Sequence, residues 1–345
     1  MKEKFLLSGY TKRLSKGVYS VLLDTDSGKL SQLTEVAAID GPTYLTTDKS
    51  GHLYTVAADG AGNGGTAAFH YDTATDEKAE LLNKILSPGA SNCYVSVDEA
   101  RDLVYAANYH LGEVRVYKRL ADGSLALTDT VKHTDHHGPK PEQKGALCHF
   151  ANLAPDNRLV VCDLGNDTVS TYAVSAEGKL SDEKIYQSAA GSGDRHITFS
   201  ADGKTAYLAC ELDSTVEVLN YENGTFNLVQ KLSTLPADYT DFNGVAAIRL
   251  SADGNFLYVS NRGHDSIACF SVAADNKKMT LFDIVPTEGN IPRDFNFNAS
   301  EDFILVAHQD SDNLTVFNRD KSSGKLSLIE KGFYAPEITC VMPVN

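Results

Sequence analysis

Five residues of this 345-residue chain have side chains able to bind an anion and move a proton: Arg195, Arg262, Arg293, His149 and Glu211. An arginine presents a planar fork of N–H groups that pairs with carboxylate or phosphate oxygens. Beside a carbonyl group it can also stabilise an oxyanion as it forms. A neutral histidine or an ionised glutamate can accept a proton from water or substrate. Together these groups favour proton-transfer chemistry on a small anionic molecule.

Each of these groups also has a structural alternative, since polar side chains are common on any solvated rim. Arg195 and Glu211 lie near enough within one repeat of the sequence to form an ion pair. Asp163 and Glu211 could bind a divalent ion, although two carboxylates alone indicate one only weakly. A polar insertion at 133–139 contains three histidines, for which a solvated loop is favoured over a metal site. We predict neither a metal nor a cofactor.

An internal repeat must position these residues. Its unit is an apolar strand, an Asp/Gly turn and a second strand that ends in a polar residue. Six copies can be traced, beginning at Pro42, Cys93, Cys148, Arg195, Ala246 and Arg293. Their spacing of roughly 46–56 residues is typical of the four-stranded blades of a β-propeller.

A second marker, a last strand that follows a polar turn, occurs seven times. These segments read GKLSQL, KAELLN, GSLALT, GKLSDE, GTFNLV, KKMTLF and GKLSLI. Lys78–Leu86 is the best helix candidate in the sequence, but its place in the repeat predicts a strand instead. Seven last strands stand against only six first strands. The C-terminal run 338–344 supplies the first strand of the seventh blade, and the N-terminal run 4–10 lies beside it as the second strand. Joining the two chain ends in one blade leaves no open edge between the first and last repeats. We predict an all-β protein: one closed seven-bladed β-propeller domain over residues 1–345, with the N- and C-terminal strands paired in one blade.

In a propeller, the start of each first strand and the end of each second strand lie at the same mouth of the central channel. The other mouth receives the turns SADG, APDN and ASED. Among the residues that the rule places at the first mouth we select eight candidates: His149, Glu211 and Arg195 as catalytic groups, and Arg262, Arg293, His196, Asp163 and Asn108 as substrate-binding groups. Clustered arginines there would locally reverse the field of an acidic surface.

The composition limits the classes of partner. Lys and Arg number 31 against 46 Asp and Glu, a formal net charge of −15, which disfavours nucleic acid and anionic membranes. No apolar run approaches the roughly 20 residues of a membrane span, and the N-terminal apolar stretch is too short for a signal peptide. Six cysteines without a C-x-x-C pair indicate buried, reduced thiols, so we expect a cytoplasmic protein. Serine-hydrolase, Walker and dinucleotide motifs are missing.

Along essentially its whole length the sequence resembles the propeller-type 6-phosphogluconolactonases of the larger seven-bladed lactonase family. The resemblance is strongest in five segments: Cys148–Arg158, Gly193–Phe199, Ala209–Val218, Ser260–Ile267 and Pro292–Phe297. The family also includes carboxy-muconate lactonising enzymes with a comparable His, Glu and Arg set, which implies roles for His149, Arg195, Glu211 and either Arg262 or Arg293. Relatives often have GPRH where this chain has GDRH, so a carboxylate stands next to Arg195, which would weaken its affinity for an anion.

The resemblance implies hydrolysis of 6-phospho-D-glucono-1,5-lactone to 6-phosphogluconate, the second step of the oxidative pentose phosphate route. Glu211 or His149 would activate water, Arg195 would stabilise the oxyanion, and Arg262 or Arg293 would hold the phosphate of this small anionic sugar-phosphate lactone. Two alternatives stay open. One is another lactone enzyme, such as a carboxy-muconate cycloisomerase or a sugar lactonase. The other is a non-catalytic propeller that binds a ligand or a protein.

Overall fold

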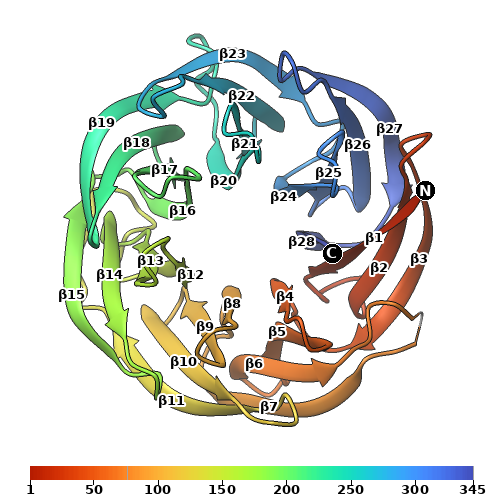
Figure 1. Cartoon of the computed structure of the whole chain (residues 1–345), viewed down its shortest axis with the longest axis vertical. Helices are drawn as coiled ribbons and strands as arrows, with labels where there is room; N and C mark the ends of the chain where they lie inside the picture. The colour runs from red at the N-terminus through yellow and green to blue at the C-terminus, as the bar shows by residue number, and fades with distance from the viewer. Residues whose placement is uncertain (76, 345) are drawn as a thin grey trace. The chain divides into compact units, whose positions relative to one another are not determined.

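The computed structural model describes residues 1–75 and 77–344, and folds them into 28 strands that form seven four-stranded sheets (Figure 1). The seven last strands fall where the polar-turn marker predicts them, and Lys78–Leu86 contributes to strand β7 rather than to a helix. Among the described residues, no helix is long and apolar enough to cross a membrane.

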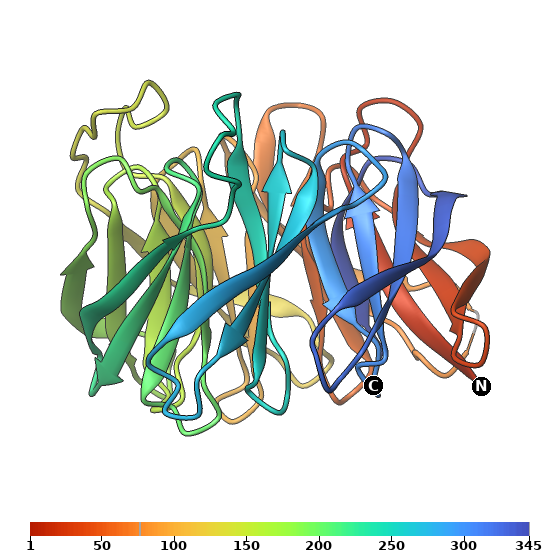
Figure 2. The same cartoon turned by 90° about the horizontal axis from the view of Figure 1, so that it is seen from above.

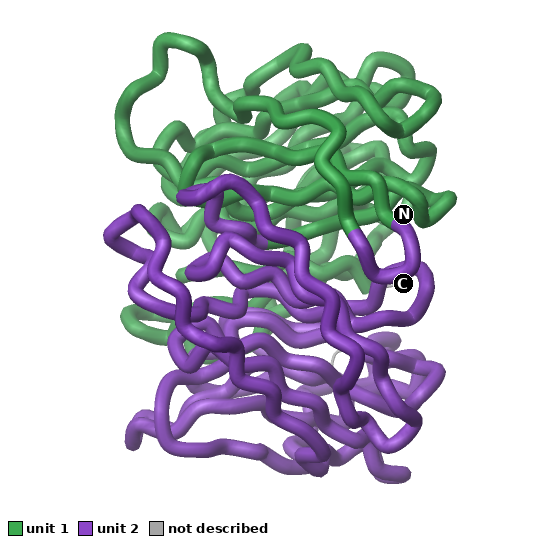
Figure 3. The backbone as a smooth tube through the Cα atoms, turned by 90° about the vertical axis from the view of Figure 1, so that its left-hand side faces the viewer, with its two compact units in different colours: residues 1–34, 196–221, 226–345 green, residues 35–195, 222–225 purple. Residues whose placement is uncertain are grey.

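The chain divides into two compact units (Figure 3). Unit 1 comprises Met1–Thr34, His196–Tyr221 and Phe226–Asn345, and unit 2 comprises Glu35–Arg195 and Glu222–Thr225. The boundary separates two neighbouring candidates, because Arg195 belongs to unit 2 and His196 to unit 1.

Unit 2 contains three complete sheets. The first consists of β4 (Leu45–Thr47), β5 (His52–Ala58), β6 (Asn63–His70) and β7 (Glu80–Pro88). The second consists of β8 (Tyr94–Asp98), β9 (Leu103–Asn108), β10 (Glu113–Arg119) and β11 (Leu125–Lys132). The third consists of β12 (Cys148–Leu153), β13 (Leu159–Asp163), β14 (Thr168–Val174) and β15 (Leu180–Gln187).

Unit 1 contains two complete sheets and most of two others. The complete ones are β20 (Gly244–Leu250), β21 (Phe256–Arg262), β22 (Ser266–Val272) and β23 (Met279–Pro286), and then β24 (Pro292–Phe297), β25 (Phe303–His308), β26 (Asn313–Arg319) and β27 (Leu326–Tyr334). The others are β16 (Asp194–Phe199), β17 (Thr205–Cys210), β18 (Thr215–Glu222) and β19 (Thr225–Ser233), and then β28 (Ile338–Pro343), β1 (Lys2–Gly9), β2 (Gly17–Asp24) and β3 (Lys29–Ala38).

Burial explains why the inner and outer strands differ in sequence. The second strand β9 reads LVYAAN and is buried at every position, whereas the last strand β15 reads LSDEKIYQ and is largely exposed. A short continuous apolar run is typical of a strand covered on both faces. Figure 2 shows the blue last strand β23 crossing the teal strands of its own sheet obliquely, as the twist of a β-sheet requires.

The two ends of the chain share one sheet, as predicted. Strand β1 pairs antiparallel with β2 on one side and with β28 on the other (Figure 1). Phe5 and Leu7 of β1 and Ile338 and Val341 of β28 are buried in one apolar cluster. Hydrogen bonds and apolar burial therefore both join β1 to β28.

All six cysteines are free, and the expectation that they are buried is confirmed for five of them, Cys93 being half-buried. Burial raises the pKa of the Cys148 thiol well above its usual range. Burial likewise raises the pKa of Cys162, where the nearby Asp194 and Asp163 carboxylates add to the effect and Arg195 opposes it.

Candidate functional site

Three of the predicted residues occupy one recurrent position of the repeat. His149 is the extra residue of a β-bulge in β12, and Arg293 is the extra residue of the corresponding bulge in β24. Arg195 precedes the turn of its own repeat by the same number of residues as these two. Bulges are often found beside active sites, where they redirect a side chain. The repeat register therefore places these three residues at equivalent points of three blades.

The two candidate catalytic residues of unit 2 are both buried. His149 is 5% exposed and Arg195 is 2% exposed. The His149 ring packs edge-on against Tyr109, with 5.7 Å between the ring centroids. Next to Arg195, the Asp194 carboxylate accepts a hydrogen bond of 2.8 Å from the hydroxyl of Ser188. Protein contacts thus fix the carboxylate that distinguishes GDRH from GPRH.

The other two candidates of unit 2, Asp163 and Asn108, hold loops. Both are fully buried. The Asp163 carboxylate accepts hydrogen bonds from backbone and side-chain donors of the segments on either side of β12 and β13: Leu147, Gly165, Asn166 and His133. The Asn108 amide donates to Ala90 and Asn92 and accepts from the backbone of Leu111. These contacts are those of structural residues.

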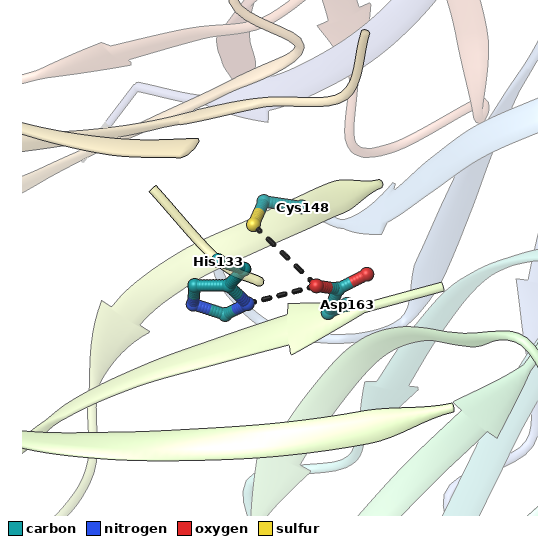
Figure 4. Close-up of side chains that lie close together, drawn as sticks. All are labelled: His133, Cys148 and Asp163. Atoms are coloured by element: carbon teal, nitrogen blue, oxygen red, sulfur yellow. Dashed lines mark hydrogen bonds and ion pairs between the residues drawn. The ribbon is translucent and has the colours of Figure 1, made fainter. Parts of the chain in front are cut away.

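The expectation of a solvated loop at 133–139 is wrong for its first histidine. His133 is 8% exposed, and its Nδ1 lies 2.8 Å from Oδ2 of Asp163 (Figure 4). Its Nε2 lies 3.0 Å from the hydroxyl of Tyr172. Two partners that are distant in sequence therefore draw His133 out of water. The expectation holds for the other two histidines, His136 and His137, which are exposed.

His133, Cys148 and Asp163 are the one group of possible metal ligands found among the described residues, with ligand atoms within 4.8 Å of one another. The sulfur lies 3.9 Å from Oδ2 of Asp163 (Figure 4). Zinc takes a thiolate, so an ion here would first have to displace the proton of the Cys148 thiol, whose pKa burial raises. Asp163 is also already occupied by several donors. This donor set fits a hydrogen-bonded hub better than a metal centre.

Unit 1 joins two of its predicted residues in an ion pair. The Arg262 guanidinium lies 2.8 Å from Oε2 of Glu211, and the two side chains are 15% and 18% exposed. Arg262 also donates to the backbone oxygens of Gly244 and Val245, at 3.2 and 3.1 Å. In this pairing, which was not predicted from the sequence, an arginine from the end of β21 orients the carboxylate that follows β17.

Arg293 has a different environment. Its guanidinium donates to the hydroxyl of Tyr10 at 3.2 Å and to the side-chain oxygen of Gln309 at 3.0 Å. Both of these hydrogen-bond acceptors of Arg293 are uncharged. His196, the remaining candidate of this unit, is buried within β16.

Tyr10, which accepts a hydrogen bond from Arg293, is a candidate residue that sequence reasoning missed. It directly follows β1, which is the second strand of the sheet shared by the two chain ends. The strand-end rule that selected Asn108 and Asp163 would have selected Tyr10 too, had it been applied to this blade. The signal was therefore present in the sequence.

Comparison with known proteins places the chain in a family. The model of the family "Lactonase, 7-bladed beta-propeller" matches residues 4–343. A 6-phosphogluconolactonase of Bacillus subtilis is 38% identical over 336 residues, covering 96% of this chain and 95% of that protein. An uncharacterized protein of Lactococcus lactis subsp. cremoris is 60% identical over 346 residues, covering 100% of both chains. Among solved structures, the periplasmic gluconolactonase of Pseudomonas aeruginosa has a TM-score of 0.92 at 29% identity, covering 100% of this chain and 99% of that one.

Seven four-stranded sheets, with both chain ends in one of them, define the protein as a seven-bladed β-propeller. Within that class, the chain belongs to the lactonase family. The fold class predicted from the repeat and the resemblance to the propeller-type 6-phosphogluconolactonases are both confirmed.

Proposed function

We propose that the protein hydrolyses 6-phospho-D-glucono-1,5-lactone to 6-phosphogluconate in the cytoplasm, as part of the pentose phosphate pathway. The family and the relative from Bacillus subtilis support lactone chemistry. The observation that carries the proposal is the ion pair of Glu211 and Arg262, because it presents an oriented, partly exposed carboxylate. The ion pair is formed by the ionised carboxylate, which is the form that can accept a proton from water.

In this proposal Glu211 is the general base and Arg262 positions it. Arg262 is poorly suited to hold a phosphate, because its charge is balanced by Glu211 and its other contacts are with backbone oxygens. Arg293 has neutral partners, so it is the better choice for the anionic group. His149 is more deeply buried than Glu211, which favours Glu211 as the residue that meets water.

Arg195 stabilises the oxyanion and His149 assists in positioning the lactone. The role of Arg195 rests on the family resemblance, and that of His149 rests on the bulge position that it shares with Arg293. No step requires a covalent nucleophile, because water attacks the carbonyl carbon, the ring ester C–O bond breaks, and the proton taken up by Glu211 returns to the leaving hydroxyl.

The test is lactone loss, measured above the uncatalysed rate with freshly prepared substrate. Glu211→Gln is expected to lower kcat/KM about 100-fold or more, as loss of a general base does. Arg195→Ala is expected to lower kcat by a similar factor, since one oxyanion donor is worth about 100-fold. Glu222→Gln, at an exposed glutamate, is the matched control and should leave the rate unchanged. Equal rates for Glu211→Gln and Glu222→Gln would remove Glu211 from the mechanism.

A substrate panel separates this proposal from the nearest alternative. Glucono-1,5-lactone lacks the phosphate, and a gluconolactonase is among the similar structures. A preference for the phosphorylated lactone in kcat/KM supports the proposed substrate. Equal values for both lactones would make the protein a general sugar lactonase, and turnover of neither would favour a binding role.

A further inference from the structure

The connection between β1 and β2, residues Tyr10–Lys16, is a preformed loop. It contains Lys12, Arg13 and Lys16 within a chain of formal net charge −15, and we call it the basic loop. A single buried carboxylate, that of Glu337, organises its backbone. It accepts hydrogen bonds of 2.8–3.1 Å from four consecutive N–H groups, those of Lys12, Arg13, Leu14 and Ser15.

The burial and the backbone conformation of Glu337 both hold its carboxylate beneath the basic loop. It is 2% exposed and adopts a φ of 58°, a left-handed conformation that is uncommon for a residue with a side chain. Burial alone would raise its pKa, but the backbone N–H groups outweigh that effect and hold the pKa below its usual value. The carboxylate is therefore ionised at neutral pH. Such conformations tend to cluster at functional sites.

One cation of the basic loop serves to fix it in place. The Arg13 guanidinium lies 2.7 Å from Oδ1 of Asp312, and it also donates to the backbone oxygen of Gln309 at 3.2 Å. Both partners follow β25, so Arg13 ties the loop to that strand end. Because Asp312 balances its charge, Arg13 contributes little attraction for a further anion.

Two other cations share one aromatic ring. The Lys12 ammonium lies 4.2 Å from the centroid of the Tyr10 ring, and the Arg293 guanidinium lies 5.5 Å from it. Gln309 separates Arg293 from the carboxylate of Asp310, since its side-chain oxygen accepts from the arginine and its amide donates to that carboxylate. Tyr10 therefore brings together two positive charges whose described contacts are an aromatic ring and neutral acceptors.

We propose that Lys12 and Arg293, held around Tyr10, form an anion subsite that binds the phosphate of the substrate. Arginine offers paired N–H groups and lysine a point charge to phosphate oxygens. In a protein of strongly negative net charge, such a local pair of cations is what draws an anion to one place. The identity of the substrate rests on the proposed function, whereas binding of the anion does not.

Lys16 provides a matched control for Lys12. It is exposed and lies in the same loop, and its backbone N–H binds the hydroxyl of Tyr19. Lys12→Gln and Lys16→Gln therefore remove the same charge from the same loop. Titration calorimetry with inorganic phosphate at low ionic strength is expected to show about tenfold weaker binding for Lys12→Gln, which corresponds to the loss of one charge-assisted contact. Lys16→Gln should bind phosphate like the unaltered protein.

Kinetics supply the second measurement. Lys12→Gln should raise KM for 6-phosphogluconolactone by a similar factor and leave kcat/KM for glucono-1,5-lactone unchanged. Equal losses in both lysine variants, or no phosphate binding by the unaltered protein, would overturn the subsite. If neither lactone is opened but phosphate binding depends on Lys12, the proposed function fails and the subsite stands. If turnover depends on Glu211 but not on Lys12, the function stands and the subsite fails.

Discussion

A missing side chain makes room for the pairing of Glu211 with Arg262. A Cβ atom added at Gly244 would lie 3.1 Å from Nη2 of Arg262 and 3.6 Å from Cγ of Glu211. Gly244→Ala is therefore expected to displace the guanidinium by a few tenths of an ångström. Because small misplacements of catalytic groups are costly, kcat/KM should fall about tenfold, while the melting temperature changes little.

A double-mutant cycle checks this cause. In the Glu211→Gln background, Gly244→Ala should have little further effect, since both changes act on the same pair. Additive losses in kcat/KM would show that Gly244 acts elsewhere.

Residue types and repeat positions could be predicted from the sequence, but the pairing of charges could not. The equivalent positions of His149, Arg195 and Arg293 could be predicted because the repeat fixes where they fall. The partner of Glu211 depends on side-chain torsions and on which guanidinium lies nearest, and a linear pattern contains neither. His133 was misjudged for a related reason: its insertion lies outside the repeat, so nothing in the sequence indicated its contact with Asp163.

At the scale of elements, the basic loop should depend on the charge of Glu337. A glutamine can accept with only one oxygen, and its amide group would face the backbone N–H groups that the carboxylate binds. Glu337→Gln is expected to lower the free energy of unfolding by about 2 kcal/mol at pH 7, as the loss of charge-assisted hydrogen bonds does. Urea unfolding measures this difference.

The pH dependence of that difference follows from the lowered pKa of Glu337. A carboxyl group whose pKa is lower in the folded state stabilises fully above its unfolded pKa, and this stability is lost as the pH falls through the folded value. The difference in free energy of unfolding between the unaltered protein and Glu337→Gln should therefore become smaller below about pH 4.5. Glu330→Gln is the control, because that carboxylate accepts one backbone hydrogen bond, from Leu30. A difference that is constant with pH would mean that the charge of Glu337 is not the cause.

Strand positions were the most predictable level of structure. Continuous apolar runs such as LVYAAN and polar-turn markers such as GKLSDE fixed the inner and outer strands. The bulges at His149 and Arg293 were not predicted, because one extra residue in a strand leaves the apolar pattern nearly intact.

For the whole molecule, the count of blades followed from arithmetic on the repeat. Seven last strands against six first strands required the C-terminus to supply the seventh, and β28 does so. The boundary between the two compact units was not predicted, since it falls within a repeat, between Arg195 and His196. Hydrophobic periodicity carries no signal for such a division.

The pairing of β28 with β1 should be essential for stability. Deleting residues 338–345 removes the buried side chains of Ile338, Cys340 and Val341 and leaves β1 as an open edge, which invites aggregation. Burying one aliphatic side chain is worth about 1.5–3 kcal/mol, so the loss approaches the whole stability of a typical domain, about 5–15 kcal/mol. The shortened chain is expected to be insoluble or to melt far below the full chain in a thermal unfolding scan. A synthetic peptide of residues 338–345, added during refolding, should restore soluble protein because it can pair with the vacant edge of β1. A shortened chain that melts within a few degrees of the full chain would show that the core around Phe5 and Leu7 is stable without β28.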